Sequence, residues 1–187
     1  MTVSIITPCT HDRAQFIERL SICIERQTVQ PLEWLIDYEG GRIGEKRNRL
    51  NAAAKGDIII PMDSDDIYLP TYIERAVIAL QMSGRQLVGL DTFPMHNVVT
   101  NEVHMFSNPM AVTEATHVYY RRGFPLFPNV RTGEGKAILK QVNYTSYNSN
   151  DFMATVHGSN TCSHEVLPLI KKLPQNVAAL ILSRFYY

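Results

Sequence analysis

The sequence predicts an α/β fold with a mostly parallel central sheet. Short β-branched runs alternate with helical segments over the first eighty or so residues, a rhythm typical of βαβ units. The run at residues 58–62 is wholly apolar, as expected of a buried strand. Three carboxylates follow it within four residues, at Asp63, Asp65 and Asp66. The chain therefore combines a buried sheet with a dense acidic cluster at the end of one strand.

The N-terminal half is expected to alternate three strands with three helices. Residues 3–7 are mostly β-branched and stop at Pro8, which predicts a first buried strand. Asp12 has the character of a helix cap, and apolar residues recur at helical spacing from there to about residue 27. The same reasoning gives the next elements: strands at 33–37 and 58–60, and helices at 45–54 and 71–82.

After Gly84 the pattern changes to β segments joined by turns. We expect such segments, mixed with the parallel part, at 87–91, 101–106 and 115–121. Residues 134–142 are expected to be helical. Residues 166–185 are expected to hold one or two more helical pieces, interrupted by Pro174. The second half of the chain is thus predicted to be a smaller, mixed part of the same fold.

Composition limits the classes of protein to consider. The 187 residues suit one domain, and no repeat or linker divides them, so we expect a single domain with two functional halves, 1–90 and 91–187. Eighteen basic and eighteen acidic residues give a formal charge of zero, which is no global signal for nucleic acid. Three scattered cysteines favour a reducing compartment. With no apolar stretch long enough for a membrane span, we expect a cytoplasmic protein.

The acidic cluster at residues 63–66 is the first candidate for chemistry. Like charges a few ångströms apart repel, and burial raises that cost. A divalent cation is the usual remedy, since carboxylate oxygens suit Mg²⁺ or Mn²⁺. Ligands also bind at the carboxyl ends of strands in α/β sheets. The alternative is an acidic turn in which Asp66 caps the following helix, but the triple isoleucine just before the cluster favours a metal site.

Four further positions carry candidate chemistry, each with a plainer alternative. The basic run at 44–49 opens a helix and could bind an anion such as phosphate, or be a solvated face. Asp37 ends the second predicted strand and could bind a ligand or cap a turn. Glu134, between two glycines, could be a general base or only a helix-start residue. His157 lies in a small-residue loop from which it could reach a metal or a phosphate, or it could bind neither, as is the case for most single histidines.

Taken in order, these segments resemble the family 2 glycosyltransferases, which have the GT-A fold. The resemblance covers about residues 3–165 and is strongest over 3–75. The matching features are the first strand ending at Pro8, the Gln27-Thr28 pair, the strand ending at Asp37, the segment Lys46-Arg47-Asn48, the D-x-D motif in 63–66, Gly133-Glu134, and His157-Gly158-Ser159-Asn160-Thr161.

The resemblance implies a metal-dependent, inverting transfer of a sugar from a nucleotide-diphosphate sugar to an acceptor hydroxyl. It implies Mn²⁺ or Mg²⁺ as cofactor and leaves the acceptor unknown. The roles that it carries over are substrate binding by Pro8, Asp37, Arg47 and Asp63, metal binding by Asp65, Asp66 and His157, and proton removal by Glu134.

One departure from the family pattern concerns the catalytic base. Many inverting members have an Asp directly after the residue that matches Glu134, and this chain has Gly135. Either Glu134 acts as the base, or catalysis is weak or absent. A non-catalytic nucleotide-sugar or carbohydrate binder is therefore the main alternative. A sugar nucleotidyltransferase is disfavoured, because its glycine-rich start with a downstream Pro-Lys is not present here.

Overall fold

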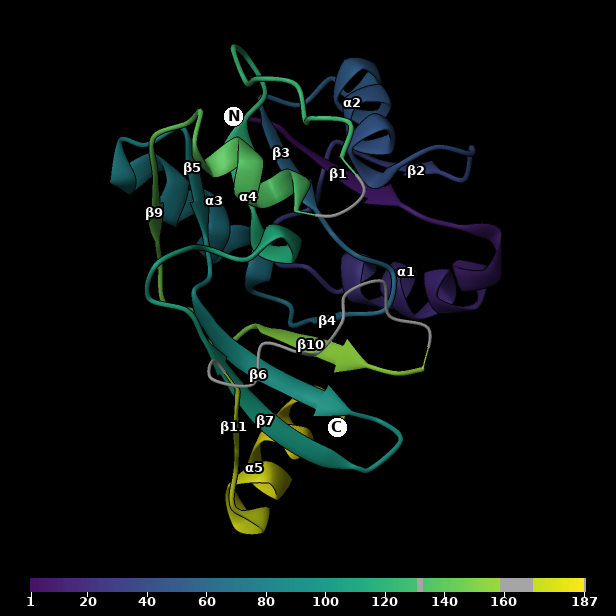
Figure 1. Ribbon diagram of the computed structural model, residues 1–187, viewed down its shortest axis with the longest axis vertical. Helices are drawn as coiled ribbons and strands as arrows, with labels where there is room; N and C mark the ends of the chain where they lie inside the picture. The colour runs from purple at the N-terminus through teal and green to yellow at the C-terminus, as the bar shows by residue number, and fades with distance from the viewer. Residues whose placement is uncertain (131–132, 159–169, 187) are drawn as a thin grey trace.

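The computed structural model describes residues 1–130, 133–158 and 170–186, and their strands form two sheets (Figure 1). The six-stranded sheet has the order β2-β1-β3-β8-β5-β9, with β1 Val3–Pro8, β2 Glu33–Asp37, β3 Ile58–Pro61, β5 Leu87–Gly89, β8 Val118–Tyr120 and β9 Tyr144–Ser146. The five-stranded sheet has the order β11-β7-β6-β10-β4, with β4 Ile67–Tyr68, β6 Thr92–Asn97, β7 Glu102–Ser107, β10 Phe152–Val156 and β11 Ile170–Lys172.

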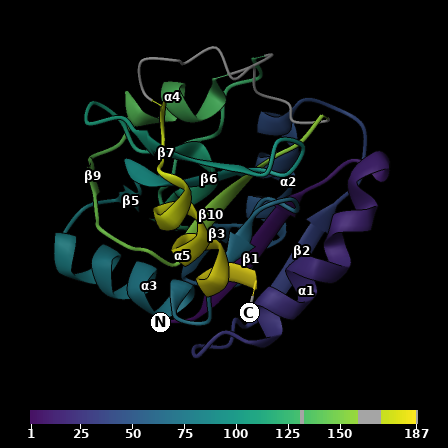
Figure 2. The ribbon, with the colours of Figure 1, turned by 90° about the horizontal axis from the view of Figure 1, so that it is seen from below.

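The helices lie between or after these strands in the chain, and all but the last cover the larger sheet on its two faces (Figure 2). They are α1 Ile17–Glu25, α2 Ile43–Ala53, α3 Tyr72–Ser83, α4 Glu134–Leu139 and α5 Gln175–Tyr186, with short 3-10 helices η1 His11–Phe16 and η2 Glu114–Thr116. In Figure 2, α1 and α3 lie on one side of β1 and β3, and α2 and α4 lie on the other. The smaller sheet lies beside the larger sheet and its helices, with α5 at the outer side of the smaller sheet (Figure 1).

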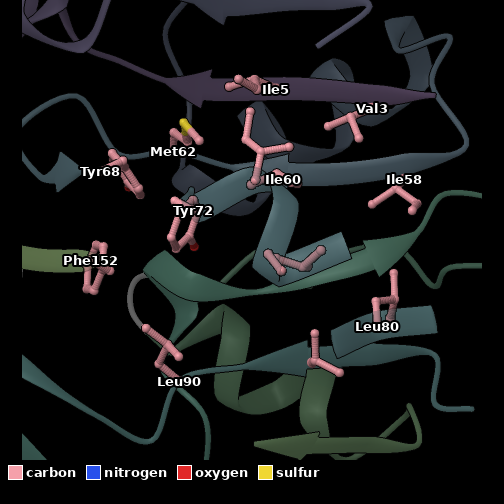
Figure 3. Packing of buried hydrophobic residues seen from close by; sticks show 14 of the residues in the cluster. Val3, Ile5, Ile58, Ile60, Met62, Tyr68, Tyr72, Leu80, Leu90 and Phe152 are labelled. Atoms are coloured by element: carbon pink, nitrogen blue, oxygen red, sulfur yellow. The ribbon is translucent and has the colours of Figure 1, made fainter. Parts of the chain in front are cut away.

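The parallel part of the larger sheet is buried on both faces, which explains its continuous apolar sequence. β1 pairs in parallel with β2 and with β3. Alternate residues of β3 then face opposite layers. Ile58 and Ile60 pack in the cluster that includes α1 and α3 residues (Figure 3), whereas Ile59 packs with Leu50 of α2 and Ile138 of α4. A strand held this firmly gives a rigid base for the residues that follow it.

The predicted fold class is confirmed, and most expected elements are present. The predicted strand at 33–37 coincides with β2, and α3 ends at Ser83 before Gly84, whose φ of 63° is the left-handed conformation that favours glycine at a helix end. α2 and β3 lie within a few residues of their predicted bounds, and so does β5, the first strand after Gly84.

Two expectations about local structure were wrong. Asp12 lies inside the first turn of η1, whose cap residue is Thr10, so the helix from there to residue 25 starts as a 3-10 helix. Residues 170–172 form β11, which pairs with β7, in a segment expected to be helical. Pairing with an existing strand outweighed local helical preference there. The rest of that expectation, over 166–169, lies outside the described residues.

Asp151 joins two helices to the smaller sheet, and we expect its loss to weaken the fold. Its Oδ2 accepts hydrogen bonds from Thr71 at 2.9 Å and forms an ion pair with Arg75 at 3.0 Å, and Oδ1 pairs with Arg184 at 3.1 Å. Both arginines are about half exposed, so solvent weakens each pair. Asp151→Ala should lower the free energy of unfolding in urea by about 2 kcal/mol. Exposed Glu18→Ala is the control, and a loss below about 0.5 kcal/mol for Asp151→Ala would contradict this role.

Candidate functional site

The carboxyl ends of β1, β2 and β3 bring the predicted N-terminal site residues to one edge of the sheet. Pro8 is the last residue of β1 and pairs in register with Asp37, the last residue of β2. The adjacent backbone continues this contact, because Cys9 N donates to Asp37 O at 2.9 Å. β3 ends at Pro61, two residues before Asp63. Parallel pairing therefore brings these residues to the same edge of the sheet.

Asp37 is held as a carboxylate that points to α2. Its Oδ2 accepts a hydrogen bond from Arg49 Nε at 2.8 Å, and its Oδ1 accepts one from Glu39 N at 2.8 Å. Burial works against the charged form, but the hydrogen bonds from Arg49 and Glu39 outweigh it and hold the pKa of Asp37 below its ordinary value. The side chain is thus a fixed, charged acceptor at the end of β2.

Asp65 and His157 meet across the edge of the sheet although 92 residues separate them. Asp65 Oδ2 lies 2.9 Å from His157 Nε2 and 3.3 Å from Arg13 of η1. His157 follows β10 directly, and its ring packs against Phe16 with centroids 4.9 Å apart. Arg19 donates to the main-chain oxygen of Asp65, which fixes the acidic turn from the side of α1.

Asp63 and Asp66 flank this pair but have different surroundings. Asp63 is half-buried, and its main-chain N donates to the Tyr68 hydroxyl at 2.8 Å. Asp66 is buried, and its Oδ1 accepts a hydrogen bond from Thr155 N of β10 at 2.9 Å. Burial raises the pKa of both carboxyls, and Asp65 adds to the shift at Asp66. Asp66 therefore connects the acidic turn to the strand that carries His157.

The donor set at Asp65 and His157 fits a divalent metal, as one carboxylate and one imidazole on rigid elements. Carboxylates suit Mg²⁺ and Mn²⁺, and imidazole is a common partner in transition-metal sites. Among the described residues, no group of three or more His, Cys, Asp and Glu side chains is arranged to hold a metal. Asp65 and His157 would therefore supply two ligands, and a bound metal would take its remaining ligands from groups other than these two side chains. Ser159, Asn160 and Thr161 of the predicted His157 loop lie outside the described residues.

Arg47 does not line the edge of the sheet where Asp37 lies, contrary to the role expected for it. It is 1% exposed, and NH1 forms an ion pair with Glu134 Oε1 at 2.5 Å. Its guanidinium also lies over the Phe127 ring, 5.4 Å from the centroid. Arg49, two residues on, is the residue that reaches Asp37. Residues two apart on a helix point in nearly opposite directions, so Arg49 reaches Asp37 while Arg47 points into the interior.

Glu134 also lies in the interior rather than on an open face. The residue is 2% exposed at the start of α4, and its carboxylate is bound to Arg47. This placement does not suit the expected direct role of Glu134 in removing a proton from an acceptor. A second carboxylate, Glu114 of η2, lies 4.0 Å from Arg47 NH1, with its side chain 29% exposed. Nothing in the local sequence around Glu114 signalled this contact, which is purely tertiary.

His117 is a second buried group beside Arg47 that the sequence did not single out. It is 1% exposed, and burial, with the charge of Arg47, lowers its pKa to about 3. The imidazole is therefore neutral at physiological pH. A neutral ring here avoids a second buried positive charge next to Arg47, whose own charge is balanced by Glu134, Glu114 and Asp63.

Comparison with known proteins identifies the family. Residues 38–146, more than half of the chain, match the family described as Glycosyl transferase family 2. A search of curated protein sequences found no match. No helix in the described part of the chain is both long and apolar enough to cross a membrane.

Similar solved structures agree on the fold. Staphylococcus aureus TarS 1–349 in complex with UDP-GlcNAc has a TM-score of 0.61 at 14% identity, over 100% of this chain and 68% of that one. Mycobacterium tuberculosis glucosyl-3-phosphoglycerate synthase with Mn²⁺ and UDP-glucose has a TM-score of 0.55 at 17% identity, over 98% and 79%. In three other TarS structures the chain spans 37%, 60% and 61% of the matched chain. With its GT-A fold and this match, the chain belongs to glycosyl transferase family 2.

Proposed function

We propose that the chain is a metal-dependent glycosyltransferase that moves a sugar from a UDP-sugar to an acceptor hydroxyl with inversion at the anomeric carbon. The observation that carries the proposal is the meeting of Asp65 and His157, at 2.9 Å, beside the strand ends that hold Asp37 and Asp63. A carboxylate and an imidazole that could hold a metal, at the same edge of the sheet as two further carboxylates, suit a nucleoside diphosphate. Uridine is favoured because the similar TarS and glucosyl-3-phosphoglycerate synthase structures hold UDP-sugars.

Each residue has a proposed task in donor binding. Pro8 and Asp37, at adjacent strand ends, would hold the nucleotide base, and Asp63 would accept hydrogen bonds from the ribose. Asp65 and His157 would hold Mn²⁺ or Mg²⁺, and a bound metal supplies Lewis-acid stabilisation of the departing diphosphate. The cluster needs a positive charge there, since burial and like charges already raise the pKa of its carboxyls.

Asp66 and Arg47 take positioning tasks in place of the direct roles expected from the sequence. Asp66 Oδ1 is bound to Thr155 N, two residues before His157, so Asp66 sets where His157 lies. Arg47 balances Glu134 and Glu114 inside the protein. A residue that orients a metal ligand typically changes affinity or activity by about 10- to 100-fold when removed.

Donor binding and turnover test the proposal directly. In the presence of Mn²⁺, UDP-glucose or UDP-GlcNAc should raise the melting temperature, and the gain should disappear with EDTA. At about 100 times its dissociation constant a ligand adds about 2.7 kcal/mol of stability. GDP-glucose, which differs from UDP-glucose only in its base, is the matched control for the base. Release of UDP should follow, and NMR should show that the sugar freed from an α-linked donor is first the β anomer.

A non-catalytic donor binder remains the second candidate, because Arg47 closes off Glu134 and position 135 is glycine. That candidate predicts the same Mn²⁺-dependent thermal shift with no release of UDP under any acceptor condition. Absence of both the shift and the release would contradict both candidates.

A further inference from the structure

The side chain of Glu114 occupies the space that a side chain at position 135 would fill. A Cβ built on Gly135 would overlap Cγ of Glu114 and lie 2.5 Å from its Cδ. The main-chain N of Lys136 donates to Glu114 Oε1 at 3.2 Å, which fixes the carboxylate against the first turn of α4. The position of Glu114 therefore requires glycine at position 135. The Glu114 carboxylate lies where a side chain of residue 135 would otherwise be.

Glu114 and Glu134 differ in what they can reach. The Glu134 side chain is 3% exposed and bound to Arg47 at 2.5 Å, so its carboxylate is engaged inside the protein. The Glu114 side chain is 29% exposed and lies 4.0 Å from the same guanidinium, too far for a hydrogen bond. Of the two carboxylates beside Arg47, Glu114 is the one that solvent or a ligand can contact.

The charged groups around Glu114 set its proton affinity. Burial raises its pKa most, the negative charge of Glu134 raises it further, and Arg47 opposes both, with a final value of about 7. Lys136 faces it through its main-chain N–H, and the neutral His117 lies on the same connection to β8. A base works best when its pKa is near the working pH, which this carboxyl satisfies.

We propose that Glu114 is the general base of the reaction, in place of Glu134. This inference rests on the proposed glycosyl transfer. The Glu114 carboxylate takes the proton from the acceptor O–H while that oxygen bonds to the anomeric carbon. The bond from that carbon to the diphosphate oxygen breaks, and the nucleoside diphosphate leaves with its electron pair. Glu114 then returns its proton to water. Arg47 and Glu134 are positioning residues that hold Glu114 and its charge in place.

The test compares Glu114→Gln with the matched surface variant Glu102→Gln, with UDP-glucose, Mn²⁺ and water as acceptor. Glu114→Gln should lower the rate constant of UDP release by about 10²- to 10⁴-fold, with UDP-glucose affinity within about 2-fold of wild type. Glu102→Gln, whose side chain pairs with Lys172 and lies near His104 on the smaller sheet, should match wild type. The wild-type rate should rise with pH through about 7, because the base acts deprotonated, and Glu114→Gln should lose that rise.

Moving the carboxylate from position 114 to position 135 gives a second, independent readout. Glu114→Gly alone should be as slow as Glu114→Gln, and adding Gly135→Asp should restore at least about 10-fold of the rate, since the carboxylate returns to the same space from the other element. If Glu114→Gln releases UDP at the wild-type rate, or keeps its pH profile, the assignment is wrong while the proposed function stands. If wild type neither binds nor cleaves UDP-glucose or UDP-GlcNAc with Mn²⁺, the proposed function fails and this inference fails with it.

Discussion

Asp65→Asn is expected to lower Mn²⁺-dependent release of UDP by about 10³-fold or more. The substitution keeps the size of the side chain but removes the charged oxygen that lies 2.9 Å from His157 Nε2. Metal stabilisation of a departing diphosphate is worth several kcal/mol, and each ~1.4 kcal/mol is tenfold in rate. UDP release from UDP-glucose, followed at several Mn²⁺ concentrations, measures the effect. The dependence on Mn²⁺ should become weaker in the variant, or disappear.

The control for Asp65→Asn is Asp57→Asn, at the opposite end of the same strand. Asp57 is exposed and its carboxylate bonds to Thr2, so its loss should leave the response to Mn²⁺ unchanged. His157→Ala should act in the same direction as Asp65→Asn, because it removes the second proposed ligand. Equal Mn²⁺ dependence in wild type and Asp65→Asn would contradict the metal assignment even if both proteins are active.

Local sequence was sufficient where one strand alone decides the geometry. The isoleucines of β3 and the carboxylates directly after it are adjacent in the chain, so their placement at the edge of the sheet needed only strand direction. Asp37 followed for the same reason, as the last residue of β2. Such positions depend on burial and on parallel pairing, which a pattern of β-branched residues already encodes.

Features that depend on tertiary contacts could not be predicted from the local sequence. β6 and β10 were not predicted. β6 mixes polar residues with proline, and both strands form by pairing with each other and with β7 and β4. The orientation of Asp66 and Arg47 depends on residues far away in the sequence: Asp66 accepts a hydrogen bond from Thr155 N, and Arg47 forms an ion pair with Glu134. Glu114 has no local signal at all, and only the glycine at 135 marks its presence.

Arg47→Met is expected to lower the free energy of unfolding by about 3–5 kcal/mol. Arg47 is 1% exposed and balances three carboxylates, Glu134 at 2.5 Å, Glu114 at 4.0 Å, and Asp63. Methionine fills similar space but leaves buried negative charge without its counter-charge. Urea denaturation near pH 7.5 measures the loss. The deficit should shrink as the pH falls toward about 7. Loss of Arg47 raises the pKa of Glu114 above its wild-type value, so Glu114 binds a proton in the variant before it does in wild type, and one uncompensated charge is removed.

The partner variant Glu134→Gln should cost much less, because Arg47 keeps Glu114 and Asp63 as counter-charges. The combined variant Arg47→Met with Glu134→Gln should recover part of the stability lost in Arg47→Met, since one of the stranded charges is gone. A double-mutant cycle then gives a coupling energy on the order of 1–3 kcal/mol. If Arg47→Met unfolds within about 1 kcal/mol of wild type, or if the two effects simply add, the buried pair does not hold α2 to α4. In that case Glu114 would owe its position to the contact with Gly135 and the Lys136 main chain alone.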